Sequence, residues 1–363
     1  MTTIENQYIP QIVFHPGETL KEKMNEMNMG TKEFAIRTCK PEKTIIAVNK
    51  GESSITADMA VQFESVTAIP AHFWMKMQRE YDEYRARLKR REIISSSIEW
   101  VKQFPVASMQ KLGWIQDCRT IEDKASSLLS FFGISSPNAW EDYYCRQQLK
   151  VAFRISLVGT KEPHAVSAWL RRGDLQALKL QAEKYSERKM KSILPEIKSI
   201  MAEQPVDFFS RLQNLCLSAG VKIVYTPCLP KAPVSGSTRW LNDTPLIQIS
   251  GRYKRNDIFW FTFFHEMGHI LLHGKKDIFL EDTDFSGKVI DKEDEADKFA
   301  EKWTLSQEDE CEILKDIKLH DDDIIRYAKK LNTHPAIIIG RLQYKKIIPY
   351  NVGRKFVELL DFN

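Results

Sequence analysis

The chain has 363 residues, and because domains usually hold about 100–200 residues, we expect two or three domains rather than a single core. Hydrophobic residues make up 43% and charged residues 28%, which is a globular composition and excludes a disordered or fibrous chain. The net charge of +4, from 53 basic and 49 acidic residues, is too small to indicate nucleic-acid binding through overall charge, so any such contact must be local.

Cysteine usage and the first residues indicate the compartment. Six cysteines lie far apart with no CxxC pair, so the sequence predicts neither a disulfide framework nor a thiolate zinc site. The amino-terminal MTTIENQYIPQIVF lacks a basic start followed by an apolar run, and no stretch approaches about 18 uninterrupted apolar residues. We therefore expect a cytoplasmic protein in a reducing compartment, with no membrane partner.

Residues 1–91 are predicted to form an all-helical domain. Short helical patterns alternate with polar breaks from Gly17 to about Glu64, and a longer pattern runs from about Ala71 to Arg91. The stretch HPGETLKEKMNEMNMGTKEFAIRTCKPEKTIIAVNKGESSITADMAVQFESV resembles the HigA-like antitoxin branch of the Xre-type helix-turn-helix family. The resemblance implies operator DNA as a partner, bound by a homodimer.

Two short segments of this module would form the helix-turn-helix, Thr31–Arg37 and Pro41–Val48, with the second in the major groove. Cys39 stands at the turn position commonly held by glycine, which is less favourable if its φ is positive. The expected DNA contacts are Lys43 and Thr44 to base edges and Lys32, Lys40 and Lys50 to phosphates. The alternative is that the module has become a dimerisation or protein-docking domain.

Residues 92–204 keep a helical pattern without a chemical cluster, which predicts a helical connecting region. One of its segments, AVSAWLRRGDLQA (Ala165 to Ala177), is similar to a segment of longer regulator–peptidase fusions. Beyond Gly220 the pattern changes to short β-branched or alternating runs separated by turn residues, at 221–227, 237–241 and 245–250. These runs predict a small, largely antiparallel sheet.

The stretch FWFTFFHEMGHILLH, Phe259 to His273, contains the motif HExxH at His265, Glu266 and His269. Four residues make about one helical turn, so both imidazoles project from one helix face at a spacing suited to two ligands of a tetrahedral zinc ion. Glu266, about 100° round the helix from His265, can serve as general base. The apolar flanks predict a buried helix, in which these polar groups are costly without a partner. The structural alternative is a pair of satisfied core histidines.

A hydrolytic zinc site needs a third protein ligand and one open position. The absence of HExxHxxGxxH excludes the metzincin arrangement. His273 lies one turn beyond His269, and three consecutive turns climb away from a single ion, so we expect His273 to be a packing residue or a residue that supports a ligand. The next helix, DKEDEADKFAEKW, offers Glu293 and Glu295 on opposite sides of its apolar stripe, and helical geometry favours Glu293 only slightly. Either acid could instead be a solvated residue on an exposed flank.

The run GSTRWLNDTPLIQISGRYKRNDIFWFTFFHEMGHILLH followed by EDEADKFA resembles the ImmA/IrrE family of zinc metallopeptidases. The family's ExxA signature maps onto Glu293 to Ala296, so the resemblance implies that Glu293 is the third zinc ligand beside His265 and His269. It also implies an α+β, zincin-like peptidase domain, which we expect over residues 205–363.

The expected fold is therefore mostly α with a small antiparallel β-sheet. The favoured function is a DNA-binding transcriptional regulator fused to a zinc-dependent metalloendopeptidase that cleaves a regulatory protein. The chief alternative is an antitoxin that binds a neighbouring toxin and represses its own operon. A third hypothesis, a peptidase with a degenerate helix-turn-helix, predicts hydrolysis without sequence-specific DNA binding.

Overall fold

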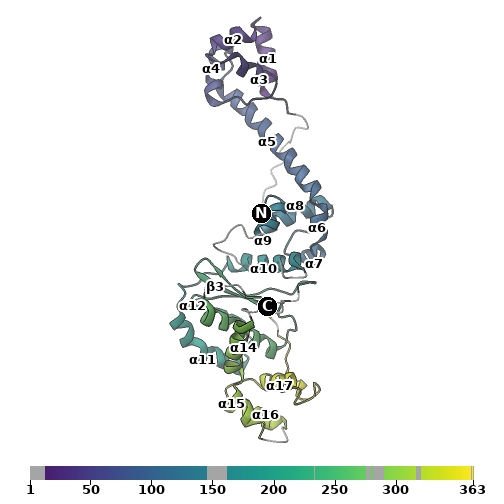
Figure 1. The fold of residues 1–363 in the computed structure, drawn as a ribbon, viewed down its shortest axis with the longest axis vertical. Coiled ribbons are helices and arrows are strands. Elements are labelled where there is room, and N and C mark those ends of the chain that lie inside the picture. The colour runs from purple at the N-terminus through teal and green to yellow at the C-terminus, as the bar shows by residue number, and fades with distance from the viewer. Residues whose placement is uncertain are drawn as a thin grey trace. The chain divides into compact units, whose positions relative to one another are not determined.

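A computed structural model describes residues 13–144, 162–232, 234–274, 279–280, 290–315, 320–360 and 362. The chain separates into two compact units, Met1–Ser96 and Ser97–Asn363, whose elements are labelled in Figure 1. Most of the expected connecting region, residues 92–204, belongs to the second unit and packs there with the sheet and its helices.

The regular structure of the first unit is all helical over its described residues, 13–96, as predicted. Its helices are α1 (Pro16–Glu26), α2 (Thr31–Arg37), α3 (Glu42–Asn49), α4 (Ala57–Thr67) and α5 (Ala71–Ser96). Each helix contributes apolar side chains to one shared core, which includes Leu20, Phe34, Ile45, Phe63 and Trp74. The side chain of Thr56 caps α4 by accepting a hydrogen bond from the Met59 amide, which fixes where that helix begins.

Helices α2 and α3 are short, pack against each other and are joined by a tight turn, as a helix-turn-helix requires. Phe34, Ile45 and Val48 are buried between them and the rest of the unit. The turn passes through Cys39, whose φ of 51° is left-handed, so a glycine would be less strained there. Pro41 is the N-cap of α3, which therefore begins one residue later than predicted.

The second unit contains the sheet and the remaining helices. Its helices are α6 (Ile98–Lys102), α7 (Val106–Lys111), α8 (Ile121–Phe132), α9 (Pro137–Tyr144), α10 (Pro163–Ala177), α11 (Glu187–Glu203), α12 (Phe208–Ser218), α13 (Asn256–Gly268), α14 (Ile290–Thr304), α15 (Gln307–Ile313), α16 (Asp321–Lys330) and α17 (Pro335–Tyr344). Its strands are β1 (Lys222–Tyr225), β2 (Gly236–Leu241), β3 (Thr244–Ile249) and β4 (Phe279–Leu280). A 3-10 turn at Arg354–Phe356 lies near the carboxyl end.

The described strands form one sheet in the order β1-β3-β2-β4. Strands β2 and β3 make a tight antiparallel hairpin through Asn242, whose φ of 57° suits such a turn. Strand β4 also pairs antiparallel with β2, but β1 pairs parallel with β3. The sheet is therefore mixed rather than wholly antiparallel, because the chain passes from β1 beyond β3 to form β2 and then returns through the hairpin.

Helices cover both faces of this sheet (Figure 1). Ile223 and Ile247 point into the core shared with α12 and α13, whereas their neighbours Val224 and Leu246 pack with Ala177 of α10. Successive residues of a strand point to opposite faces, so α10 lies on one face and α12 and α13 on the other. The second unit is thus α+β, the class predicted for its residues 205–363.

A buried ion pair joins α10 to the sheet. Arg239 on β2 is fully buried, and its Nε and Nη2 donate to Asp174 Oδ1 over 2.9 and 2.7 Å. Its Nη2 also donates to Gln248 Oε1 over 2.7 Å. A Cβ at Gly173 would lie 2.0 Å from Gln248 Oε1, so the helix approaches closely because this residue is glycine. The run AVSAWLRRGDLQA therefore provides the face of α10 that docks on the sheet.

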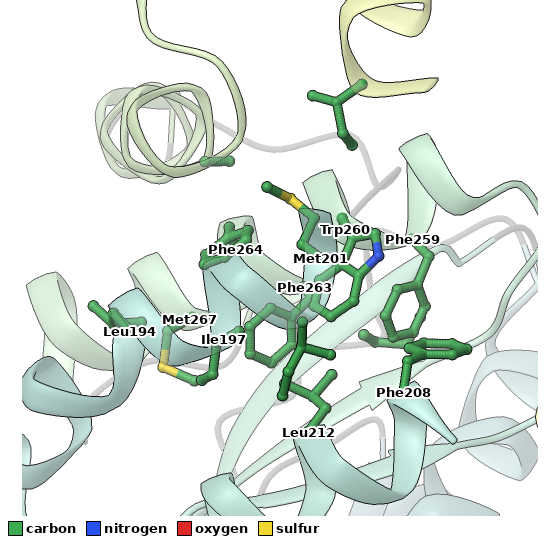
Figure 2. Packing of buried hydrophobic residues seen from close by; sticks show 14 of the residues in the cluster. Leu194, Ile197, Met201, Phe208, Leu212, Phe259, Trp260, Phe263, Phe264 and Met267 are labelled. Carbon is green, nitrogen blue, oxygen red and sulfur yellow. The ribbon is translucent and has the colours of Figure 1, made fainter. Parts of the chain in front are cut away.

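Helix α13 is buried because most of its circumference is apolar. Figure 2 shows its side chains packed against helices α11 and α12. The labelled residues are Phe259, Trp260, Phe263, Phe264 and Met267 from α13, Leu194, Ile197 and Met201 from α11, and Phe208 and Leu212 from α12. The helix that carries most of the HExxH motif therefore lies in the centre of the core.

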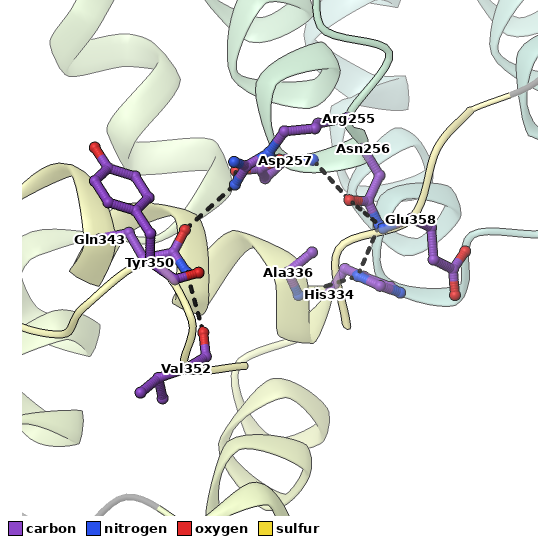
Figure 3. Close-up of polar contacts among 9 residues, drawn as sticks. All are labelled: Arg255, Asn256, Asp257, His334, Ala336, Gln343, Tyr350, Val352 and Glu358. Atoms are coloured by element: carbon purple, nitrogen blue, oxygen red, sulfur yellow. Dashed lines mark hydrogen bonds and ion pairs between the residues drawn. The ribbon is translucent and has the colours of Figure 1, made fainter. Parts of the chain in front are cut away.

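The amino end of α13 is fixed by the last part of the chain (Figure 3). Asn256 Oδ1 accepts the Glu358 amide over 3.3 Å, and Asn256 Nδ2 lies 3.4 Å from His334 Nδ1, just before α17. Arg255 pairs with Asp257 through two contacts of 2.9 and 2.8 Å. The starting point of the HExxH helix thus depends on the carboxyl-terminal segment.

Two further observations concern membrane-spanning helices and cysteines. No helix within the described ranges is both long and apolar enough to cross a bilayer. The cysteines in these ranges, from Cys39 to Cys311, are free thiols, whereas Cys145 lies outside the described residues.

Candidate metal centre

The HExxH motif spans the last turn of α13 and a turn of π-helix that follows it, His269–His273. His265 and His269 are both buried, and their Nε2 atoms lie 3.0 Å apart. The two imidazoles therefore project from one face of the helix, as the spacing predicts.

A carboxylate from α14 completes the cluster. Glu293 Oε2 lies 3.1 Å from His265 Nε2 and 3.6 Å from His269 Nε2. Bonds of about 2.0–2.2 Å in a tetrahedral zinc site separate ligand atoms by roughly 3.3–3.6 Å. The spacing between His269 and Glu293 falls in this range, and the two spacings to His265 Nε2 are shorter by a few tenths of an ångström. A small outward movement of His265 would therefore let the three residues hold a zinc ion with a fourth position open. Glu295, the other candidate from sequence, instead lies 3.0 Å from His273 Nε2 through its Oε2.

The protonation states of these groups suit a cation. Burial lowers the pKa of His269 to about 4. Burial alone raises the pKa of Glu293, but the interactions with the neighbouring His265 and His269 outweigh it and bring this pKa down to about 2. Glu293 Oε1 is buried and has no hydrogen-bond partner among the described residues. Neutral imidazole and ionised carboxylate are the forms that bind a divalent metal.

The Nδ1 atom of each imidazole, on the side away from the cluster, has a polar partner of its own. His265 Nδ1 lies 2.8 Å from Asp297 Oδ1, and His269 Nδ1 lies 3.0 Å from His273 Nδ1. Sequence reasoning missed Asp297. Its position one helical turn after the glutamate of the ExxA signature is the signal that could have found it, because residues four apart share a helix face.

Glu266 lies beside this cluster but outside the set of converging ligand atoms in the described residues. Its side chain is fully buried, and its backbone carbonyl accepts a hydrogen bond of 3.0 Å from Thr238 Oγ1 on β2. A Cβ built at Gly236 would lie 2.4 Å from Glu266 Oε1. The Glu266 carboxylate therefore fits against strand β2 because Gly236 has no side chain.

The residues expected to contact DNA lie on and around α2 and α3. Exposed residues are Lys32, Lys43 and Lys50, and half-buried residues are Lys40 and Thr44. The ammonium group of Lys40 forms an ion pair with Asp58 in the first turn of α4. One of the expected phosphate contacts therefore already has a carboxylate partner.

A paired-histidine helix, a glutamate from the following helix and a small sheet beside them are the features expected of a zincin-like metallopeptidase domain. Residues 216–333 match the family model of the IrrE N-terminal-like domain, Peptidase_M78. This match confirms the resemblance seen in the sequence for this part of the chain.

Solved structures are similar to a shorter part of the chain. An addiction-module antidote protein of the HigA family from Coxiella burnetii is 30% identical over 23% of this chain and 91% of its own, with a TM-score of 0.22. Antitoxin HigA from Pseudomonas aeruginosa, solved with the higBA promoter, is 28% identical over 22% of this chain and 86% of its own, with a TM-score of 0.21. Among curated proteins, none matches the chain significantly.

Proposed function

We propose that this chain is a DNA-binding transcriptional regulator joined to a zinc-dependent metalloendopeptidase that cleaves a regulatory protein partner. The observation that carries the proposal is the convergence of ligand atoms from His265, His269 and Glu293, all within 4.8 Å of one another. These three residues would hold the zinc ion, and the fully buried Glu266 follows the first of them directly.

When bound, zinc would act as a Lewis acid that lowers the pKa of water to about 7 and polarises a peptide carbonyl. Glu266 acts as the general base and acid: its carboxylate takes the proton of the attacking water and then passes it to the departing amine. The buried position of Glu266 keeps its carboxylate in one place, because Gly236 and Thr238 of β2 pack against its side chain and its backbone carbonyl.

The first unit supplies the DNA-binding half of the proposal. Its α2–turn–α3 pair leaves Lys32, Lys43 and Lys50 exposed. These cations would contact operator DNA, with α3 in the major groove and two copies of the chain reading two half-sites.

The test of the peptidase uses the full chain loaded with one equivalent of zinc. It is incubated with each protein encoded beside it, and cleavage is followed by mass spectrometry. The Glu266→Gln variant should keep the metal and lose about two orders of magnitude or more in rate. A stable complex with a neighbouring product that neither parent nor variant cleaves would overturn the peptidase proposal in favour of an antitoxin.

A further inference from the structure

A chain of hydrogen bonds leads from the candidate metal centre to the surface. His269 Nδ1 lies 3.0 Å from His273 Nδ1, and His273 Nε2 lies 3.0 Å from Glu295 Oε2. The side chain of His273 is 4% exposed and that of Glu295 is 59% exposed. A buried ligand residue is thus connected, through one buried imidazole, to an exposed carboxylate on α14.

The chemistry of these groups fixes the direction of both hydrogen bonds. A carboxylate only accepts, so the proton between His273 and Glu295 is on His273 Nε2. In a neutral imidazole the other nitrogen is then an acceptor, so His273 Nδ1 accepts and His269 Nδ1 donates. His269 Nε2 is left with its lone pair directed at the point where the three ligand atoms meet.

His265, the other histidine of the cluster, has the same tautomer because a carboxylate accepts its Nδ1 proton directly, with no second imidazole between them. His265 Nδ1 lies 2.8 Å from Asp297 Oδ1, so the carboxylate accepts directly from the ligand residue. Asp297 is two residues beyond Glu295 on α14. Helix α14 therefore orients both imidazoles through their Nδ1 atoms. Asp297 contacts His265 directly, and Glu295 acts on His269 through His273.

We infer that His273 and Glu295 are positioning residues of the metal centre. Glu295 sets the tautomer of His273, and His273 sets the tautomer and ring orientation of His269. This inference rests on the proposed zinc function, to which it adds two residues that do not touch the ion. Partners of this kind typically change metal affinity by about 10–100-fold when they are replaced.

The test uses a substitution that reverses the direction of the two hydrogen bonds made by His273. In Glu295→Lys a group that can only donate replaces one that only accepts, which forces the protons of both imidazoles to exchange places and directs an N–H of His269 at the metal. Glu295→Gln keeps an oxygen that can accept from His273. Asp294→Lys is the matched control, since Asp294 is the adjacent exposed acid on α14 and its replacement changes the charge equally.

Zinc affinity is measured for each full-length variant by competition with a chromophoric chelator, and the absorption spectrum of the cobalt-substituted protein reports the ligand geometry. We expect about 10–100-fold weaker binding and an altered spectrum for Glu295→Lys, with Glu295→Gln and Asp294→Lys close to the parent. Equal affinities for Glu295→Lys and Asp294→Lys would overturn the inference.

Two further results keep the test decisive. If Glu295→Lys does not fold, His273→Phe, which fills the same space without ring nitrogens, must show the same loss of affinity, and parental affinity in that variant refutes the role of His273. A parent protein that binds no zinc refutes the proposed function itself, which is a different outcome from a parent that binds zinc with unaffected variants.

Discussion

Gly268 of α13 and Ala296 of α14 meet backbone to backbone. A Cβ built at Gly268 would lie 3.2 Å from Ala296 Cα and 3.2 Å from Phe299 Cβ. His269 follows Gly268 directly, and Glu293 precedes Ala296 by one helical turn. The contact between two small residues therefore sets how closely the carboxylate of α14 approaches the imidazoles of α13.

A larger side chain at Gly268 should separate these helices. We expect Gly268→Val to weaken zinc binding and to lower the free energy of unfolding by about 1–3 kcal/mol, because overpacking forces neighbouring groups to shift. Gly268→Ala should have the same effect on zinc to a smaller degree. Urea denaturation and chelator competition measure the two quantities, and undiminished zinc affinity in Gly268→Val would show that the helix spacing does not control the site.

The zinc-free protein should lose stability in mild acid. The pKa of His269 is lowered from 6.5 to about 4 by burial, so the folded state prefers the neutral imidazole. This contribution is complete above pH 6.5 and is lost as the pH falls through about 4. A shift of this size corresponds to about 3 kcal/mol, and it should appear as a falling free energy of unfolding between these pH values.

Glu293 extends the same trend to lower pH. Its pKa falls from 4.5 to about 2, since the interactions with His265 and His269 outweigh the opposing effect of burial. Its contribution is present above pH 4.5 and is lost towards pH 2. Replacing His269 by glutamine should remove the slope between pH 6.5 and 4, and an unchanged slope in His269→Gln would assign it to other groups.

The buried pair of Arg239 and Asp174 should be indispensable for folding of the second unit. Asp174→Ala leaves a fully buried guanidinium without its carboxylate, and breaking such a pair costs about 3–5 kcal/mol. Lys191→Ala, which removes an exposed pair with Glu187, should cost less than about 1 kcal/mol. Similar losses in the two variants, measured by urea denaturation, would contradict this account.

The pair of Arg239 and Asp174 also predicts which fragments of the second unit can fold on their own. A fragment of residues 97–363 should unfold cooperatively, because it keeps α10 with its docking face. A fragment of residues 205–363 exposes Val224 and Leu246 and leaves Arg239 without Asp174. That shorter fragment also lacks α11, so we expect it to aggregate or to lack a cooperative transition in calorimetry, and a cooperative transition there would show that α10 and α11 are both dispensable.

The features best predicted from sequence are those fixed by local spacing. The i, i+4 histidines and their apolar flanks indicate a buried helix with both imidazoles on one face, which the structure shows for His265 and His269. The alternation of strand residues likewise predicts the small sheet. The convergence of Glu293 with them depends on how α14 lies against α13, and helical geometry alone left Glu295 almost as plausible.

Other features depend on contacts between distant segments. The parallel pairing of β1 with β3 follows from the path of the chain, which no local pattern records. The function of the run WLRRGD becomes clear only when Asp174 meets Arg239, 65 residues later. Asp297 was missed because an acid on an exposed helix flank looks the same in sequence whether or not a histidine faces it.

The ion pair between Lys40 and Asp58 makes a specific prediction about DNA binding. Lys40 lies at the turn of the helix-turn-helix, and its side chain is held by a carboxylate that would also repel phosphates. Asp58→Ala should therefore strengthen binding to DNA of any sequence and steepen the salt dependence by about one unit of slope. Glu64→Ala, which removes an exposed acid elsewhere on α4, is the matched control for charge.

Gel shifts on the region upstream of the gene, against scrambled DNA at several salt concentrations, separate general from specific contacts. Lys50→Ala should weaken binding to both DNAs alike, because phosphate contacts carry no sequence information. Lys43→Ala should instead reduce the preference for the native region, since its side chain projects from α3, the helix expected in the major groove. If the parent protein binds both DNAs equally at low salt, the first unit is a docking or dimerisation domain and the regulator half of the proposal is wrong.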